Sequence, residues 1–140
     1  MEKPGHSKGR ILLIDHDEEW LGSARSALTT AGYSIETAQR IPEALDLPDL
    51  YDLVLANWAQ ADQDRRLLRR LAQPESPNAP CVVVMFPILR LHERTREAFK
   101  VGAFDCVDKP FDKGELVKLV EALLKDYARI ISSTVHGGQT

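Results

Sequence analysis

The chain has 140 residues, of which 44% are hydrophobic and 28% charged. These proportions are typical of one soluble globular domain, large enough to be stable without a disulfide or a structural metal. The formal net charge of −3 is too small to indicate nucleic acid or a membrane surface as a bulk partner. No apolar run approaches the roughly 20 residues that a membrane-spanning helix needs.

The two ends of the chain are polar. Residues 1–9 lack the apolar core of a signal peptide, and we expect them to form a flexible leader. Residues 132–140 contain glycine and are expected to form a flexible tail. The domain is therefore predicted to span residues 10–131 and to be cytoplasmic.

The first half of the chain alternates apolar runs with segments of helical period. Residues 11–14 predict a strand that ends in the acidic cluster 15–19. The apolar positions of residues 20–31 form one helical stripe, and Gly32 stands where a helix C-cap belongs. A second strand, a short helix and a third strand are expected at residues 33–37, 42–47 and 53–56.

A helix with two contrasting faces is predicted at residues 62–72. Its leucines share one face, and nearly opposite them lie four arginines, Arg65, Arg66, Arg69 and Arg70. The next helix adds the basic residues Arg90, Arg94, Arg96 and Lys100. Such charges usually form a solvated surface, and the alternative is that they steer an acidic partner.

The rest of the chain continues the alternation. A valine-rich run at 81–86 suits a strand buried on both faces, and a helix at about 92–101 and a strand at 104–107 follow it. These strands contain Cys81 and Cys106, which we expect to be reduced, buried thiols. The last helix begins after Asp112, which with Glu115 resembles a capping box, and it runs to residue 131. Five strands and five helices in alternation predict a parallel sheet with helices on both faces.

Such a sheet binds or reacts at the carboxyl ends of its strands. Those ends carry Asp15, His16, Asn57, the turn at 85–87 and Lys109. No glycine-rich turn follows the first strand, and its cluster of carboxylates would repel a phosphate group. Dinucleotide or flavin binding is therefore disfavoured.

Three segments resemble the receiver domain of two-component response regulators. They are ILLID at 11–15, YDLVLANW at 51–58, and GAFD at 102–105 leading to KPF at 109–111. Their order and spacing match the family from Arg10 to Leu124. The resemblance implies a flavodoxin-like, CheY-like, doubly wound sheet with strand order 2-1-3-4-5.

The resemblance also implies roles for the residues at the crevice. In receivers, two adjacent acids after the first strand help to hold Mg²⁺, an aspartate ending the third strand accepts a phosphoryl group from a histidine kinase, and a lysine before a proline stabilises the phosphoryl oxygens. Asp15 matches the first acid and Lys109 the lysine. His16 replaces the second acid, and Asn57 replaces the acceptor.

The family's two switch positions are altered as well. The hydroxyl residue that ends the fourth strand has no counterpart, since Met85 or Pro87 stands there depending on how a loop difference of roughly two residues is placed. Cys106 replaces the aromatic residue of the fifth strand. The residues that rearrange around a phosphoryl group in the family are therefore missing.

These replacements have chemical consequences. A neutral amide is a far poorer nucleophile than a carboxylate, so Asn57 should abolish acyl phosphate formation at that position. Mg²⁺ favours carboxylate oxygens, and only Asp15 remains to bind it, so we expect weak or absent Mg²⁺ binding and no cofactor. A single histidine, His16, does not indicate a zinc site. Lys109 is expected to pair with Asp15, with Asn57 bridging them by hydrogen bonds.

The prediction is a receiver that is not an enzyme and acts as a protein interaction module in a two-component or phosphorelay pathway. Its expected partner is a histidine kinase or a downstream regulator, without direct contact to nucleic acid or membrane. A homodimer through the last helices is a further possibility, since residues 127–131 offer an apolar patch. Two alternatives stay open: phosphorylation of another crevice carboxylate, Asp15 or Asp62, and sensing of a small molecule.

Overall fold

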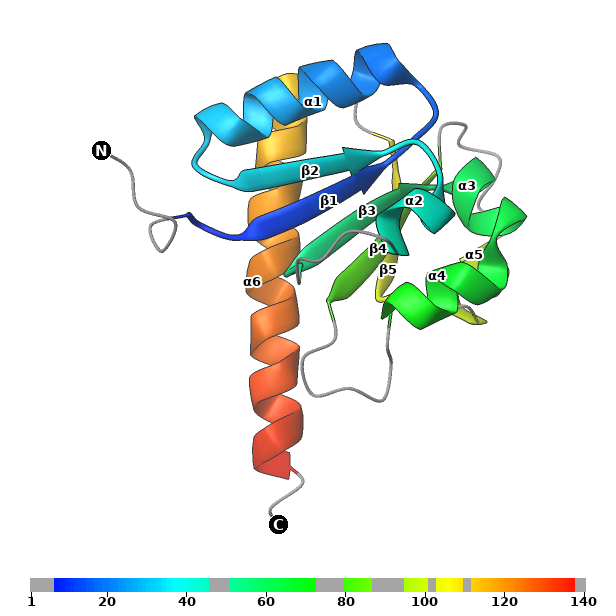
Figure 1. Cartoon of the computed structure of the whole chain (residues 1–140). Helices are drawn as coiled ribbons and strands as arrows, with labels where there is room; N and C mark the ends of the chain where they lie inside the picture. Colours follow the sequence, from blue (N-terminus) through cyan, green and yellow to red (C-terminus); the bar gives the residue numbers. More distant parts are fainter. Residues whose placement is uncertain are drawn as a thin grey trace.

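The five apolar runs form one parallel sheet with the strand order β2-β1-β3-β4-β5 (Figure 1). The computed structural model describes residues 7–45, 51–72, 80–86, 95–100, 103–109 and 112–137. The strands are β1 (Arg10–Ile14), β2 (Ser34–Ala38), β3 (Leu53–Asn57), β4 (Cys81–Phe86) and β5 (Asp105–Asp108). This order confirms the predicted doubly wound sheet.

Six helical segments of the described residues pack against the sheet. They are α1 (Glu18–Thr30), α2 (Ile41–Leu45), α3 (Trp58–Gln63), α4 (Arg65–Ala72), α5 (Thr95–Lys100) and α6 (Lys113–Gly137). Figure 1 shows α1 and α6 on one side of the sheet and the other helices on the opposite side. None of these helices combines the length and apolar character of a membrane span.

Alternation along the strands divides the buried residues into two cores. In β1, Leu12 and Ile14 point towards the side of α2 to α5, where they join a cluster that includes Leu68. Ile11 and Leu13 point to the other side and join the residues of α1 and α6. The period of two residues along a strand produces this division. Strands β3 and β4 each lie between two other strands and are buried at every position.

Two helices have capped ends, as predicted for Gly32 and Asp112, and Asp17 is an additional cap. The Asp17 side chain accepts a hydrogen bond from Trp20 N at the start of α1, and Asp112 Oδ1 accepts one from Glu115 N at the start of α6. Gly32, just beyond α1, has a φ of 108°, a conformation that glycine adopts without the penalty other residues meet.

The segment between β3 and β4 differs from its prediction. A single helix was expected at residues 62–72, but α3 begins directly after β3, and Asp64 separates it from α4 with φ −126° and ψ 51°. The reason is the buried pair Trp58 and Ala61, which lie one turn apart and pack on the core. The chain therefore has six described helical segments where five were expected.

The last helix is longer than expected. It runs for 25 residues to Gly137 and extends past the end of the sheet (Figure 1). Residues 132–137 are polar but contain no proline, and serine and threonine reduce helix propensity without breaking a helix. The part expected to be a flexible tail is thus helical as far as residue 137, and the division into leader, domain and tail stays a prediction.

Candidate functional site

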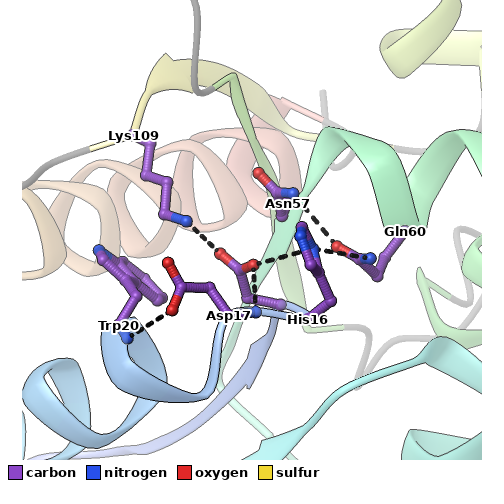
Figure 2. A network of polar contacts seen from close by, with 7 residues as sticks. His16, Asp17, Trp20, Asn57, Gln60 and Lys109 are labelled. Carbon is purple, nitrogen blue, oxygen red and sulfur yellow. Dashed lines mark hydrogen bonds and ion pairs between the residues drawn. The ribbon is translucent and has the colours of Figure 1, made fainter.

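The carboxyl ends of three strands bring the predicted crevice residues together. Asp15 follows β1, Asn57 ends β3, and Lys109 follows β5. Figure 2 shows Lys109 and Trp20 on one side of the cluster and Asn57, His16 and Gln60 on the other. The parallel arrangement of the strands causes this convergence, because all their carboxyl ends meet at one edge.

A buried ion pair forms one half of the cluster. Lys109 Nζ lies 2.6 Å from Asp15 Oδ2, and both side chains are almost fully buried. Asp15 Oδ1 also accepts a hydrogen bond of 3.1 Å from Asp17 N. Lys109 Nζ lies 4.7 Å from the centre of the Trp20 ring, within the range of a cation–π interaction. The lysine is therefore held between a carboxylate and an aromatic face.

A chain of amides forms the other half. Asn57 Nδ2 donates to Gln60 Oε1 at 3.2 Å, and Gln60 Nε2 lies 3.3 Å from His16 Nδ1. His16 Nδ1 is also 3.5 Å from Asp15 Oδ1. An imidazole that is unprotonated at Nδ1 accepts from Gln60, whereas a protonated ring favours Asp15. Asn57 and Gln60 are buried, while the His16 side chain is 68% exposed.

The prediction that Asn57 bridges Asp15 and Lys109 by hydrogen bonds is wrong. Its amide nitrogen points to Gln60, and its Oδ1 atom is buried without a hydrogen-bond donor among the described residues. The ion pair of Asp15 and Lys109 forms as predicted, but it does so without Asn57. The reason is α3, which begins immediately after Asn57 and places Gln60 within reach of its side chain.

The crevice does not fit a divalent cation. Asp15 is the acid expected to bind the cation, and its Oδ2 atom lies 2.6 Å from Lys109 Nζ. Within the part of the chain that the structure describes, no three His, Cys, Asp or Glu side chains are grouped to hold a metal ion. Mg²⁺ prefers several oxygen ligands, and a single carboxylate that is paired with a lysine does not supply them.

The switch positions carry side chains without hydroxyl groups. Met85 pairs in register with Asn57 and is fully buried, and Pro87 lies outside the described residues. Cys106 is half-buried in β5, and burial, with a smaller contribution from the Asp105 carboxylate, raises its pKa to about 11. Burial likewise raises the pKa of Cys81 to about 12. Both thiols are free and protonated near neutral pH.

Two residues of the cluster were missed in the sequence. Trp20 was assigned to the apolar stripe of the first helix, although its ring also lies against Lys109. Gln60 precedes the helix predicted at residues 62–72, although a helix beginning at residue 58 puts it three residues from Asn57 on the same face. The apolar pair Trp58 and Ala61, three residues apart, is the feature of the sequence that indicates this helix.

Comparisons with known proteins agree with this geometry. The family model of the response regulator receiver domain matches residues 11–121. The chain is 27% identical over 123 residues to the nisin biosynthesis regulatory protein NisR of Lactococcus lactis subsp. lactis, covering 83% of this chain and 50% of that protein. It is 33% identical over 118 residues to the response regulator MprA of Mycolicibacterium vanbaalenii, covering 83% of this chain and 50% of MprA.

Among solved structures, the receiver domain of the Francisella response regulator 1452 is similar, with a TM-score of 0.68 and 25% identity. The match covers 86% of this chain and 99% of that chain. The chain belongs to the response regulator receiver domain family, whose members are signalling modules of two-component systems. It spans about half the length of the two curated relatives.

Proposed function

We propose that this receiver is not phosphorylated at residue 57 and acts by binding other proteins. The observation that carries the proposal is Asn57, a buried amide at the end of β3, where the resemblance implies the phosphoacceptor aspartate. An amide oxygen is a poor nucleophile, and neither Cys81 nor Cys106 supplies a thiolate near neutral pH. Signalling by this domain then depends on its surface.

The ion pair supports the same proposal. In the family, the lysine that corresponds to Lys109 contacts the phosphoryl oxygens. Here its ammonium group is paired with Asp15 and covered by Trp20. Drawing Lys109 towards an incoming phosphate would leave the Asp15 carboxylate buried without its partner, which is strongly unfavourable.

The two alternative acceptors are placed differently. Asp15 is fully buried and paired with Lys109, so a phosphoryl donor has poor access to its carboxylate oxygens. Asp62 is half exposed on α3, where its Oδ1 atom accepts a hydrogen bond of 2.9 Å from Arg65 Nε. An exposed carboxylate outside the crevice lacks the lysine that stabilises phosphoryl oxygens. Neither position offers the arrangement found around a receiver acceptor.

A small-molecule sensor would require a cavity at the crevice. A cavity of about 560 Å³ does occur, but it lies between α1, the end of β2 and α2, and is lined by residues that include Leu21, Arg25 and Thr37. None of its lining residues belongs to the cluster around Asn57. The proposed partner is therefore a protein of a signalling pathway, such as a histidine kinase or a downstream regulator.

Incubation with acetyl phosphate and Mg²⁺, followed by intact-mass measurement, tests the proposal. The wild-type chain should show no added phosphoryl group. A stoichiometric gain of one base-labile phosphoryl group would overturn it, and mapping the modified peptide would distinguish Asp15 from Asp62.

A further inference from the structure

The four arginines of α4 fall into two pairs with different surroundings. Helix α4 contains no acidic residue, and all four arginines are exposed to solvent. Leu68, Leu71 and Ala72 face the core on the opposite side. The contacts of the guanidinium groups separate one pair, Arg65 and Arg69, from the other, Arg66 and Arg70.

Arg65 and Arg69 hold neighbouring helices together. Arg65 Nε donates to Asp62 of α3 at 2.9 Å, and its guanidinium carbon lies 5.6 Å from the centre of the buried Trp58 ring. Arg65 also lies 3.9 Å from Glu97 of α5. Arg69 Nη1 donates to the backbone oxygen of Lys100 at 2.9 Å. These two arginines thus have a structural role.

Arg66 and Arg70 make no hydrogen bond or ion pair with any residue that the structure describes. They lie one turn apart, where like charges repel. Arg66 is also in the first turn of α4, where the helix dipole disfavours a cation. Among the described residues these two charges have no intramolecular partner, so both guanidinium groups are available to a group outside the chain.

Among the described residues, the acids near α4 do not neutralise this pair. Asp62 and Glu97 lie against Arg65, and Asp64 lies 3.7 Å from Arg40. On α5, Arg96 and Lys100 add exposed positive charge, while Arg90 and Arg94 lie outside the described residues. A surface with excess positive charge therefore stands on a chain whose net charge is −3.

We propose that Arg66 and Arg70 form a docking surface for an acidic segment of a protein partner. Guanidinium groups bind carboxylates in a bidentate geometry, and two groups one helical turn apart match carboxylates with the same spacing on a partner helix. A long nucleic acid fits less well, because the rest of the chain carries the compensating negative charge and would repel it. The inference extends the proposed interaction role but does not depend on the chemistry of Asn57.

Nuclear magnetic resonance titration of the isotope-labelled 140-residue chain tests the surface. The probe is a helical peptide with glutamates at positions i and i+4, and its control has glutamines at the same positions. The glutamate peptide should shift the backbone signals of α4 and bind at least about tenfold more tightly than the glutamine peptide. The variant R66Q/R70Q should lose this preference.

A matched variant controls for net charge. K118Q/K125Q removes two exposed positive charges from α6, on the other side of the sheet, and should bind the glutamate peptide within about twofold of wild type. Unchanged spectra elsewhere in each variant show that the fold is intact.

Three results would overturn the proposal: no binding of the glutamate peptide at millimolar concentration, equal weakening by both double variants, or tighter binding of a DNA duplex or of phosphatidylserine vesicles. The phosphoryl content of the chain is measured separately. Failure of the docking surface therefore leaves the assignment of Asn57 intact, and the reverse also holds.

Discussion

Asn57 changes more than the nucleophile at the end of β3. An aspartate there would place a second carboxylate close to Asp15, whereas the amide allows Lys109 to serve Asp15 alone. Asn57 instead bonds to Gln60, which leads on to the exposed ring of His16. The crevice thus consists of an ion pair and an amide chain, which approach each other where His16 Nδ1 lies 3.5 Å from Asp15 Oδ1.

The contributions of Asp15 and Lys109 to stability should be energetically coupled. Replacing Lys109 with methionine leaves the buried Asp15 carboxylate without a partner, and the expected loss of unfolding free energy is about 3–5 kcal/mol. Adding Asp15→Asn should recover part of that loss, because the unpaired charge is then removed. Urea denaturation of both single variants and the double variant measures the coupling, and strictly additive losses would contradict it.

The thiols should be unreactive near neutral pH. Because burial and the Asp105 carboxylate raise the pKa of Cys106 to about 11, on the order of one molecule in a thousand carries the thiolate at pH 8. Cys81, with a pKa of about 12, should react more slowly still. In the unfolded chain both thiols lose their protons near pH 9, which is below their pKa values in the folded protein. The stability that the protonated thiols contribute is therefore fully present below about pH 9. It is lost as the pH rises towards 11 for Cys106 and towards 12 for Cys81.

Iodoacetamide labelling followed by mass spectrometry checks this order of reactivity. Labelling should be slow at pH 8 in the folded protein, should rise with pH at Cys106 before Cys81, and should be fast in urea. Labelling of folded Cys106 at the urea rate would show that its thiol is not shielded.

The two halves of this site differ in how well the sequence predicts them. The ion pair was predictable because acid and lysine at the carboxyl ends of parallel strands converge whatever the details of the loops. The amide chain depends on where one helix begins. A shift of a few residues decides whether Gln60 faces Asn57, and Gln and Asp near residue 60 mask the apolar period that begins at Trp58.

At the level of helices, the junction of α3 and α4 depends on Trp58. The ring is buried, lies 5.5 Å from the centre of the Phe86 ring, and is covered by Arg65. Trp58→Ala should lower the unfolding free energy by about 3–5 kcal/mol, as expected for a large buried aromatic residue. Chemical denaturation measures this, with Gln63→Ala on the exposed end of α3 as a nearly neutral control. A loss below about 1 kcal/mol would contradict the burial of the Trp58 ring in the core.

The charges of α4 lead to an unusual prediction for stability. Arg66→Glu replaces an unpaired cation in the first turn with an anion that the helix dipole favours, and should raise stability by about 0.5 kcal/mol. Arg65→Glu should lower it, because Arg65 contacts Asp62 and Trp58. Thermal unfolding of the two variants gives the comparison. Destabilisation by Arg66→Glu would indicate a structural partner for Arg66.

The last helix limits the proposed self-association. Tyr127 is half-buried and packs edge-on against Phe104, with ring centres 5.1 Å apart. It therefore belongs to the core more than to an exposed apolar patch. The side chains at 130 and 131 lie outside those that the structure describes. The apolar patch of residues 127–131 and the homodimer therefore remain predictions.

For the whole molecule, the alternation of strands and helices was sufficient to predict the sheet. The strands were predicted within one residue of their observed ends because their apolar runs are short and clearly bounded. The end of the last helix was missed, since polar residues can continue a helix or leave it with nearly the same free energy. Family membership came from three motifs whose order the fold then explained.

Restoring the acceptor alone should not restore receiver chemistry. Asn57→Asp returns the nucleophile, but His16 still replaces the second acid, Met85 or Pro87 the hydroxyl residue, and Cys106 the aromatic residue that the family uses. With acetyl phosphate and Mg²⁺, we expect this variant to gain phosphate in only a small fraction of molecules. Efficient modification would show that the other replacements matter little.

The phosphoryl content of the wild-type chain is the most direct test of the central claim. Intact mass should be measured after prolonged incubation with excess acetyl phosphate and Mg²⁺, with Asn57→Asp in parallel and a phosphorylatable receiver as a positive control for the reagent. The account predicts an unmodified wild-type mass while the control is phosphorylated. One phosphoryl group per wild-type molecule would contradict it.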